Sequence, residues 1–225
     1  MIFLEHVSKH FHHEGQTKTI ARDISFCFPQ GERVGLLGRN GAGKSTILKM
    51  LSGRILPDQG RIHRTGTISW PVGFAGFFHN DLTGGQNARF IARVYGLNPH
   101  DVTEACEEFA GLGSQMNWPV STYSSGMKSR LAFAVSMAVP FDTYLIDEIT
   151  AVGDQAFRVR CEEMLKSHLK NRSAVIVSHS PEILQNLCTS AVVLENGRFF
   201  YYAKVSKALE HYQHLMAGRL PPWMC

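Results

Sequence analysis

The segment Gly38-Arg39-Asn40-Gly41-Ala42-Gly43-Lys44-Ser45-Thr46 constrains the fold more than any other part of the chain. It fits the pattern G-x-x-x-x-G-K-[ST], in which glycines let the backbone wrap around a phosphate group. The apolar segment Glu32 to Leu37 before it predicts a short strand, and Lys44 to Leu51 predicts a helix. A strand, a glycine-rich loop and a helix in this order favour a P-loop nucleotide site over a chance match.

Within this loop, each residue type has a recognisable use. Lys44 places a positive charge at the β- and γ-phosphates and counts among the catalytic residues, and Ser45 offers its hydroxyl to Mg²⁺. The other predicted nucleotide-binding residues of the loop are Gly38, Asn40, Gly41, Ala42, Gly43 and Thr46. We therefore expect a nucleotide with β- and γ-phosphates, together with Mg²⁺, as cofactors.

Two adjacent acids follow an apolar strand later in the chain. Thr143 to Asp147 predicts that strand, and Glu148 comes directly after it. A Mg²⁺ ion held by one hydroxyl and two phosphate oxygens usually also uses a carboxylate. Asp147 is expected to orient a water on Mg²⁺, and Glu148 to polarise the attacking water as a general base.

A second phosphate-like segment, YSSGMKSRLAFAV, runs from Tyr123 to Val135. Two serines and a glycine open an apolar helical pattern, and a helix N-terminus favours an anion. The chain therefore carries two predicted phosphate sites.

Strand and helix patterns alternate along most of the chain, which indicates an α/β fold with a mainly parallel sheet flanked by helices. We predict a P-loop NTPase core with an antiparallel β subdomain and a helical subdomain. One domain is expected over 1–218, with a helical lobe at about 80–140 and a C-terminal tail at 219–225. The expected strands are Ile2–Val7, Ala21–Phe28, Glu32–Leu37, Thr143–Asp147, Ala174–Ser178, a hairpin within Val192–Tyr202, and strand-like segments on both sides of the turn Pro57–Gly60; the expected helices are Lys44–Leu51, a mostly helical Leu82–Val139, Phe157–Leu169, one from Pro181, and Lys204–Met216.

Composition and charge bear on several functional classes. The 23 Lys and Arg against 19 Asp and Glu give a net charge of +4 without a basic run, so nucleic-acid binding has no support. The five cysteines are scattered without a CxxC pair and are expected to be reduced thiols. No apolar run reaches the roughly 18 to 20 residues of a membrane helix, so a membrane connection is expected through a partner.

These motifs together resemble the ATP-binding subunit of an ABC transporter, over nearly the whole chain. In that family a signature like L-S-G-G-Q opens a helix before the acidic pair, and Tyr123-Ser124-Ser125-Gly126-Met127 occupies that place. The resemblance implies that two copies pack head to tail around two ATP. Ser124, Ser125 and Gly126 would then bind the γ-phosphate of the nucleotide held by the other copy.

The resemblance also implies roles for four single residues. His179, after the strand Ala174 to Ser178, corresponds to a histidine that contacts the γ-phosphate, and Asp154 to an aspartate that contacts the opposing subunit. Phe11 stands where the family stacks an aromatic ring on adenine. His79 occupies the place of a glutamine that touches Mg²⁺ or the lytic water. The neighbours of Phe11, namely His10, His12 and His13, offer imidazoles as alternative stacking groups, while a metal site there lacks a convincing third ligand.

The phrases YSSGM, DEITAVGD and SWPVGFAGFFHNDLTG resemble the capsular polysaccharide exporters within this family. The resemblance implies a peripheral ATPase on the cytoplasmic face of the bacterial inner membrane. Its expected partners are a second copy, a polytopic permease, and periplasmic or outer-membrane export components, with no nucleic acid. An exporter of another cargo, such as O-antigen, teichoic acid, a drug or a lipid, remains the alternative. A soluble ABC-type ATPase acting on ribosomes or DNA usually joins two ATPase units in one chain or carries long coiled coils, and this sequence shows neither. A nucleotide kinase with a P-loop would not explain Tyr123 to Met127, Asp154 and His179 together.

Overall fold

The computed structural model describes residues 1–148 and 155–218, which form two compact units. The first unit contains Met1–Ile68, Asp142–Glu148 and 169–218, and the second contains Ser69–Phe141 and 155–168. The chain therefore leaves the first unit after Ile68 and returns to it twice. The predicted tail, 219–225, and the predicted site residue Asp154 lie outside the described residues.

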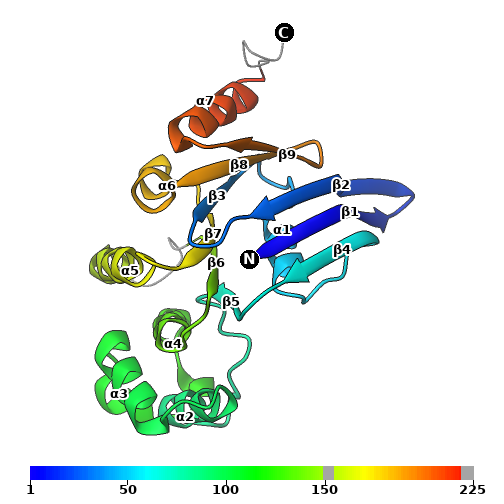
Figure 1. The fold of residues 1–225 in the computed structure, drawn as a ribbon. Helices are drawn as coiled ribbons and strands as arrows, with labels where there is room; N and C mark the ends of the chain where they lie inside the picture. Colours follow the sequence, from blue (N-terminus) through cyan, green and yellow to red (C-terminus); the bar gives the residue numbers. More distant parts are fainter. Residues whose placement is uncertain (149–154, 219–225) are drawn as a thin grey trace. The chain divides into compact units, whose positions relative to one another are not determined.

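Three antiparallel strands form one sheet of the first unit, in the order β2-β1-β4 (Figure 1). The expected front strands are confirmed and are longer than expected, because Glu14 and Gly15 form a two-residue turn with φ of 48° and 76°. Left-handed φ at both positions is the geometry that closes a tight hairpin. The strands are β1 Ile2–His13, β2 Gln16–Phe28 and β4 Gln59–Arg64.

One strand prediction is wrong. A strand was expected on each side of the turn Pro57–Gly60, but the described structure has only β4 after it. The backbone N–H groups of Arg54 and Ile55 instead donate to the Lys49 carbonyl, at 2.9 and 3.2 Å. These N–H groups satisfy the free C-terminal carbonyl groups of the preceding helix, so they are not available to a sheet.

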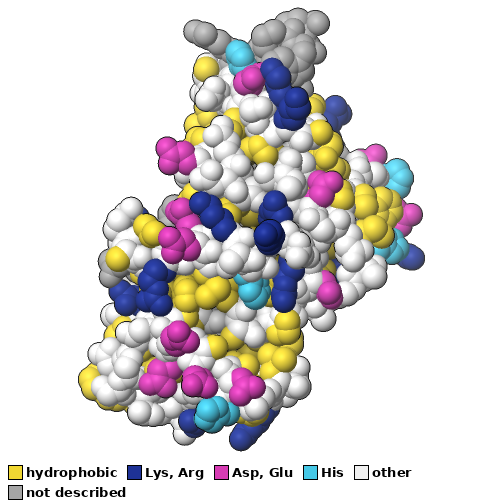
Figure 2. All heavy atoms as spheres, turned by 60° about the vertical axis from the view of Figure 1, so that its left-hand side comes forward, with side chains coloured by type: hydrophobic (Ala, Val, Ile, Leu, Met, Phe, Trp, Pro, Cys, Tyr) yellow, Lys and Arg dark blue, Asp and Glu magenta, His cyan; other side chains and the backbone are white. Residues whose placement is uncertain are grey.

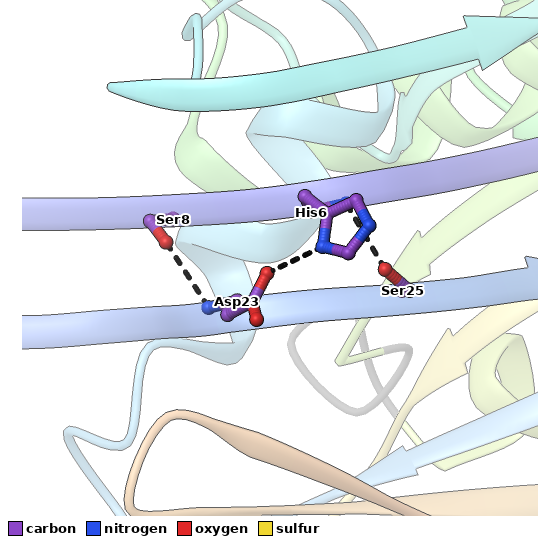
Figure 3. Close-up of polar contacts among 4 residues, drawn as sticks. All are labelled: His6, Ser8, Asp23 and Ser25. Atoms are coloured by element: carbon purple, nitrogen blue, oxygen red, sulfur yellow. Dashed lines mark hydrogen bonds and ion pairs between the residues drawn. The ribbon is translucent and has the colours of Figure 1, made fainter.

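A paired irregularity shifts the register between β1 and β2 near their middle, and Figure 3 shows the polar contacts made there. His6 and Asp23 both have left-handed backbones, with φ of 50° and 51°. The His6 N–H donates to Ser25 Oγ and the Asp23 N–H to Ser8 Oγ, each at 3.0 Å. His6 Nδ1 also lies 2.8 Å from Asp23 Oδ1. Each strand thus satisfies the N–H that the other's bulge removes from the ladder.

The second sheet carries the predicted parallel strands, in the order β5-β6-β7-β3-β8-β9. β3 pairs in parallel with β7 and β8, and β6 pairs in parallel with β7. The expected hairpin is confirmed: Asn196 and Gly197, with φ of 49° and 75°, join β8 to the antiparallel β9. The strands are β3 Arg33–Leu37, β5 Ile68–Val72, β6 Thr143–Asp147, β7 Ser173–Val177, β8 Ser190–Glu195 and β9 Arg198–Tyr202.

Helix α1, Lys44–Leu51, packs between β2 of the three-stranded sheet and strands β6 and β7 of the other sheet (Figure 1). Its side chains Ile47, Leu48, Met50 and Leu51 are fully buried in one core with both sheets. Each such side chain contributes roughly 1.5–3 kcal/mol by leaving water. The helix that follows the glycine loop is therefore held firmly, which fixes the loop in place.

Helix α6, Pro181–Leu187, precedes β8 in the chain, and the last helix, α7 Val205–Met216, follows β9. A polar network anchors α7. His211 of α7 is fully buried. Its Nδ1 lies 2.9 Å from the Tyr202 hydroxyl and its Nε2 lies 3.1 Å from Glu195 Oε2. Because both ring nitrogens have partners, burying this imidazole leaves no polar atom unsatisfied. The same two contacts tie α7 to the β8–β9 hairpin.

The second unit is mostly helical, as expected for Leu82–Val139. Thr83 caps α2 through a capping box with Gln86, and Asn98 caps α3 ahead of Pro99. Phe109, Phe133 and Phe157, from α3, α4 and α5, bring their rings within 6.3 Å of one another. The helices are α2 Gly84–Val94, α3 Pro99–Ala110, α4 Ser125–Ala138 and α5 Gln155–His168, with short 3₁₀ turns at Gly113–Asn117 and Val120–Thr122.

Candidate active site

The glycine loop joins β3 to α1, as predicted, and two of its glycines are sterically required. A Cβ atom on Gly38 would lie 2.7 Å from the Leu194 carbonyl oxygen. A Cβ atom on Gly43, whose φ is 107°, would lie 2.5 Å from Ile20 Cγ2. Any side chain here would push the loop away from β2 and β8, so the path of the loop depends on glycine.

Lys44 lies at the mouth of the loop and is 8% exposed. Its Nζ donates to the carbonyl oxygens of Gly38 at 2.8 Å and Arg39 at 3.2 Å. Burial lowers the pKa of Lys44, and the negative charges of Glu148 and Asp147 oppose that shift. The ammonium is thus held inside the loop, close enough to both carboxylates to feel their charge.

The N-terminus of α1 is open to an anion. Ser45 is exposed in the first turn, Thr46 is half-buried beside it, and the turn contains no acidic residue. Asn40 and Gly41 are exposed, and Ala42 donates its N–H to the Arg39 carbonyl at 3.0 Å. The free N–H groups and the positive end of the helix dipole therefore lie beside the Lys44 ammonium.

The predicted acidic pair lies at the carboxyl end of β6. Asp147 ends the strand, and the Glu148 N–H donates to the Val177 carbonyl of the adjacent β7 at 3.1 Å. Glu148 has a left-handed φ of 46°. Such a backbone in a residue other than glycine costs energy and is concentrated at functional sites.

His179 follows β7 and contacts Glu148 directly. Its Nε2 lies 2.7 Å from Glu148 Oε1. Slightly more than half of each side chain is buried. The carboxyl ends of parallel strands meet at one edge of a sheet, where ligands of α/β proteins bind. The structure therefore brings together Lys44, Asp147, Glu148 and His179, which were predicted from separate motifs.

The donor set suits a magnesium nucleotide. Glycines that tolerate no side chain, a buried ammonium and an open helix N-terminus favour phosphate groups. The Ser45 hydroxyl and the Asp147 carboxylate are oxygen ligands of the kind that Mg²⁺ prefers. In their chemistry, these residues fit the predicted cofactors.

Phe11 lies near the tip of the β1–β2 hairpin and is 42% exposed, with Lys9 Nζ 5.3 Å from its ring centroid. Its cross-strand partner is Lys18, whose Nζ lies 3.5 Å from the Cβ position of Gly41. The hairpin therefore reaches the glycine loop, a position compatible with stacking on a base. Lys18 carried no sequence signal, because it enters the site only through pairing of the two strands.

The histidines beside Phe11 have local partners. His10 Nδ1 lies 3.1 Å from Thr19 Oγ1, and His12 Nδ1 lies 2.9 Å from Thr17 Oγ1. Within residues 1–148 and 155–218, no group of three His, Cys, Asp or Glu side chains could hold a metal ion.

In the second unit, the signature residues form the N-terminus of α4. Ser124 is the N-cap and accepts the Met127 N–H at 3.2 Å. Ser125 and Gly126 occupy the first turn, which contains no acidic residue. These residues therefore lie at an exposed helix start, the kind of position that favours an anion.

His79 lies exposed in the loop before α2, and its position depends on Asn87. The buried Asn87 side chain accepts the His79 N–H at 2.9 Å and donates to the carbonyls of His79, Leu82 and Thr83 at 3.0 to 3.3 Å. His79 Nδ1 accepts the Asp81 N–H at 3.3 Å. The sequence analysis missed Asn87, although an amide one residue after a capping box was an available signal.

Comparison with known proteins decides the family. A family profile described as "ABC transporter" matches residues 21–151 of this chain, which is more than half of it. The chain belongs to the ABC transporter family. This match confirms the resemblance that was stated from the motifs. It also confirms the prediction that the protein is an ABC-type ATPase.

The chain is also similar to curated proteins along nearly its whole length. ATP-binding protein BexA of Haemophilus influenzae is 47% identical over 94% of this chain and 98% of that protein. Capsule polysaccharide export ATP-binding protein CtrD of Neisseria meningitidis serogroup B is 47% identical over 96% of this chain and 100% of that protein. Polysialic acid transport ATP-binding protein KpsT of Escherichia coli is 42% identical over 95% of this chain and 96% of that protein.

Among solved structures, the ATP-binding cassette MJ0796 in a dimeric post-hydrolysis state with ADP and Pi has a TM-score of 0.76. It is 19% identical to this chain, and the alignment covers 88% of this chain and 96% of that cassette. This likeness confirms the predicted ABC-type P-loop fold.

Proposed function

We propose that this protein is the ATP-binding and ATP-hydrolysing subunit of an exporter that moves capsular or related surface polysaccharide across the bacterial inner membrane through a separate permease. The observation that carries the proposal is end-to-end similarity, at 42 to 47% identity, to ATP-binding proteins named for capsule export and polysialic acid transport. The nucleotide site supplies the chemistry that this function requires.

The proposed roles follow the geometry of the first unit. Lys44, with the N-terminus of α1, binds the β- and γ-phosphates of ATP. Ser45 and Asp147 would hold Mg²⁺, which when bound neutralises charge on the phosphates. Glu148 takes the proton of the attacking water as general base, and His179, at 2.7 Å, orients its carboxylate and contacts the γ-phosphate.

The second phosphate site is proposed to act on a second copy of the chain. Ser124, Ser125 and Gly126 would bind the γ-phosphate of an ATP held by the other copy, with Asp154 contacting that copy and Phe11 stacking on the adenine. The N-terminus of α4 supports this role, because a helix start leaves N–H groups without intrahelical partners and this first turn contains no acidic residue. His79 is proposed to contact Mg²⁺ or the lytic water.

The permease is proposed to hold the ATPase at the cytoplasmic face of the inner membrane. Among the described residues, no helix is both long and apolar enough to cross a membrane. Phe90 and Val94, one helical turn apart on α2, are 56% and 60% exposed. These two neighbouring apolar side chains are compatible with a partner that docks on α2. Periplasmic or outer-membrane components would complete the exporter.

The test is a pull-down of the tagged chain from its native membranes in mild detergent, followed by mass spectrometry. Recovery of a stoichiometric polytopic permease with glycan-export components is the expected result. Recovery of the chain alone, or with ribosomes, would refute the exporter and leave an ABC ATPase with another task. A permease that accompanies drug or lipid export genes would instead replace the cargo.

A further inference from the structure

Lys18 of β2 brings a second ammonium group to the glycine loop. Its Nζ lies 3.5 Å from the Cβ position of Gly41. Ile20, two residues further along β2, packs so closely on Gly43 that it leaves no room for a Cβ atom there. Alternate residues of a strand point to the same face, so the two contacts agree with each other. This face of β2 therefore lies along the loop and carries Lys18 with it.

The Lys18 ammonium has no counter-charge in the part of the chain that the structure describes. The residue is exposed, and no carboxylate oxygen of the described residues lies within 4.0 Å of its Nζ. Lys44, by contrast, donates to the carbonyl oxygens of Gly38 and Arg39. One ammonium is thus held by the loop backbone, while the other is left beside the loop for a ligand.

A phosphate group is the ligand that this position favours. The glycine loop and the N-terminus of α1 direct backbone N–H groups at an anion, and an ammonium at the same place strengthens that site. Mg²⁺ and Lys44 offset only part of the negative charge of a triphosphate. A further cation at the loop therefore has a partner as soon as a nucleotide binds.

The pairing of β1 with β2 indicates which phosphates Lys18 can reach. Lys18 is the cross-strand partner of Phe11, so the two side chains leave the same face of the hairpin. In the proposed function, the adenine stacks on Phe11 and the γ-phosphate lies at Glu148 and His179. An ammonium that starts beside Phe11 and ends beside Gly41 is therefore near the phosphates that are closest to the nucleoside.

We propose that Lys18 binds the α- and β-phosphates of the nucleotide. The inference rests on the proposed nucleotide-binding roles of Lys44 and Phe11, and it does not depend on the cargo of the exporter. ATP and ADP share these two phosphates, so Lys18 holds the substrate and the product equally. Such uniform binding lowers KM without accelerating the chemical step.

The attraction exerted by Lys18 is local. The chain has a net charge of only +4. On the face of the molecule that Figure 2 shows, Lys and Arg side chains are scattered among acidic and uncharged ones. Salt screens exposed charges beyond about 8 to 10 Å. Removing a lysine elsewhere in the first unit is therefore expected to leave nucleotide binding unchanged.

The first experiment compares Lys18→Met with Lys170→Met as the matched control. Lys170 is also exposed, and its carbonyl accepts a hydrogen bond from Arg33 at the start of β3, whereas the glycine loop follows the end of that strand. Titration calorimetry measures the Kd of ADP and of a non-hydrolysable ATP analogue, each with Mg²⁺. Lys18→Met is expected to raise both Kd values by the same factor, about threefold to tenfold, and the control to raise neither.

Steady-state ATP hydrolysis separates binding from chemistry. Lys18→Met is expected to raise KM for ATP by the same factor and to leave kcat unchanged. Lys18→Arg keeps the positive charge and still donates to phosphate oxygens, so its KM is expected to stay within about twofold of wild type. A purely structural role for Lys18 would not produce this combination.

A third measurement distinguishes the phosphates from the base. A contact with the α- and β-phosphates weakens ADP and GDP equally, so the ratio of their Kd values in Lys18→Met is expected to equal that of wild type. A contact with the adenine would change this ratio, because only the base differs between the two ligands.

Four results would overturn the inference. An increased Kd for the ATP analogue alone would move the contact to the γ-phosphate, and a changed ratio of ADP to GDP affinity would move it to the base. A lower kcat at unchanged KM would assign Lys18 to the chemical step. Wild-type affinity in Lys18→Met, or equal losses in Lys18→Met and Lys170→Met, would remove the contact. Lys44→Ala tells this failure apart from failure of the nucleotide site, because unaltered ATP binding in that variant would refute the site as a whole.

Discussion

Replacing Asn87 with alanine is expected to destabilise the protein by about 2 to 3 kcal/mol. The side-chain amide has two N–H groups, so its contacts with the carbonyls of His79, Leu82 and Thr83 amount to two full hydrogen bonds. The bond accepted from the His79 N–H is a third. Each contributes about 1 kcal/mol, and water can replace part of the loss because His79 is exposed.

Urea unfolding at neutral pH measures this free energy, and thermal unfolding supports it. For a chain of this size, 1 kcal/mol shifts Tm by about 2–4 °C, so Asn87→Ala is expected to lower Tm by roughly 4 to 12 °C. Asn80→Ala is the matched control, because Asn80 is an exposed amide in the same loop and uses only its backbone carbonyl, which accepts the Ser121 N–H. The control is expected to stay within about 0.5 kcal/mol of wild type.

A third variant separates the donor and acceptor roles of the amide. Asn87→Asp keeps the acceptor for the His79 N–H, loses both donors and buries a charge, so it should destabilise more than Asn87→Ala. The reasoning is refuted if Asn87→Ala unfolds like wild type, or if Asn87→Asp is the milder change. The rate of ATP hydrolysis by Asn87→Ala, measured below its Tm, reports separately whether His79 must be held in place for activity.

Three further predictions concern the nucleotide site and acid stability. Glu148→Gln should lower the ATP turnover number about 10²- to 10⁴-fold while ATP still binds; unchanged steady-state turnover would remove Glu148 as the base. Lys44→Ala should weaken ATP binding at least about tenfold by titration calorimetry, and an unaltered dissociation constant would contradict the P-loop assignment. In the folded protein, the hydrogen bond from Lys9 lowers the pKa of Asp58 below its usual value of 3.8, and the hydrogen bond from the Thr67 N–H does the same for Asp142. In acid, the unfolded chain therefore binds more protons than the folded protein does. Urea midpoints should hold between about pH 7 and pH 5 and fall below about pH 4; midpoints that rise in acid would contradict the assignment.

Local sequence determined the elements that depend on neighbouring residues. The glycine loop and α1 were predicted with their observed bounds, because required glycines, a buried lysine and a helical apolar pattern all lie within fourteen residues. The same holds for the hairpin at Asn196-Gly197, where two left-handed residues fix the turn. The strand expected before Pro57 does not form, because the backbone N–H groups of Arg54 and Ile55 pair with the Lys49 carbonyl at the end of α1.

Pairing across the sheets determined what the sequence could not. Glu148 was predicted from its place after an apolar strand and His179 from the family resemblance, but only the parallel pairing of β6 with β7 places them 2.7 Å apart. Lys18 reaches Gly41 solely through the β1–β2 register, and Asn87 acts through a loop that folds back on it. The sequence by itself therefore determined the residue types and the local backbone of the nucleotide site. Tertiary structure alone decided which groups meet, because a hydrogen bond or ion pair depends on distances that long-range strand pairing sets.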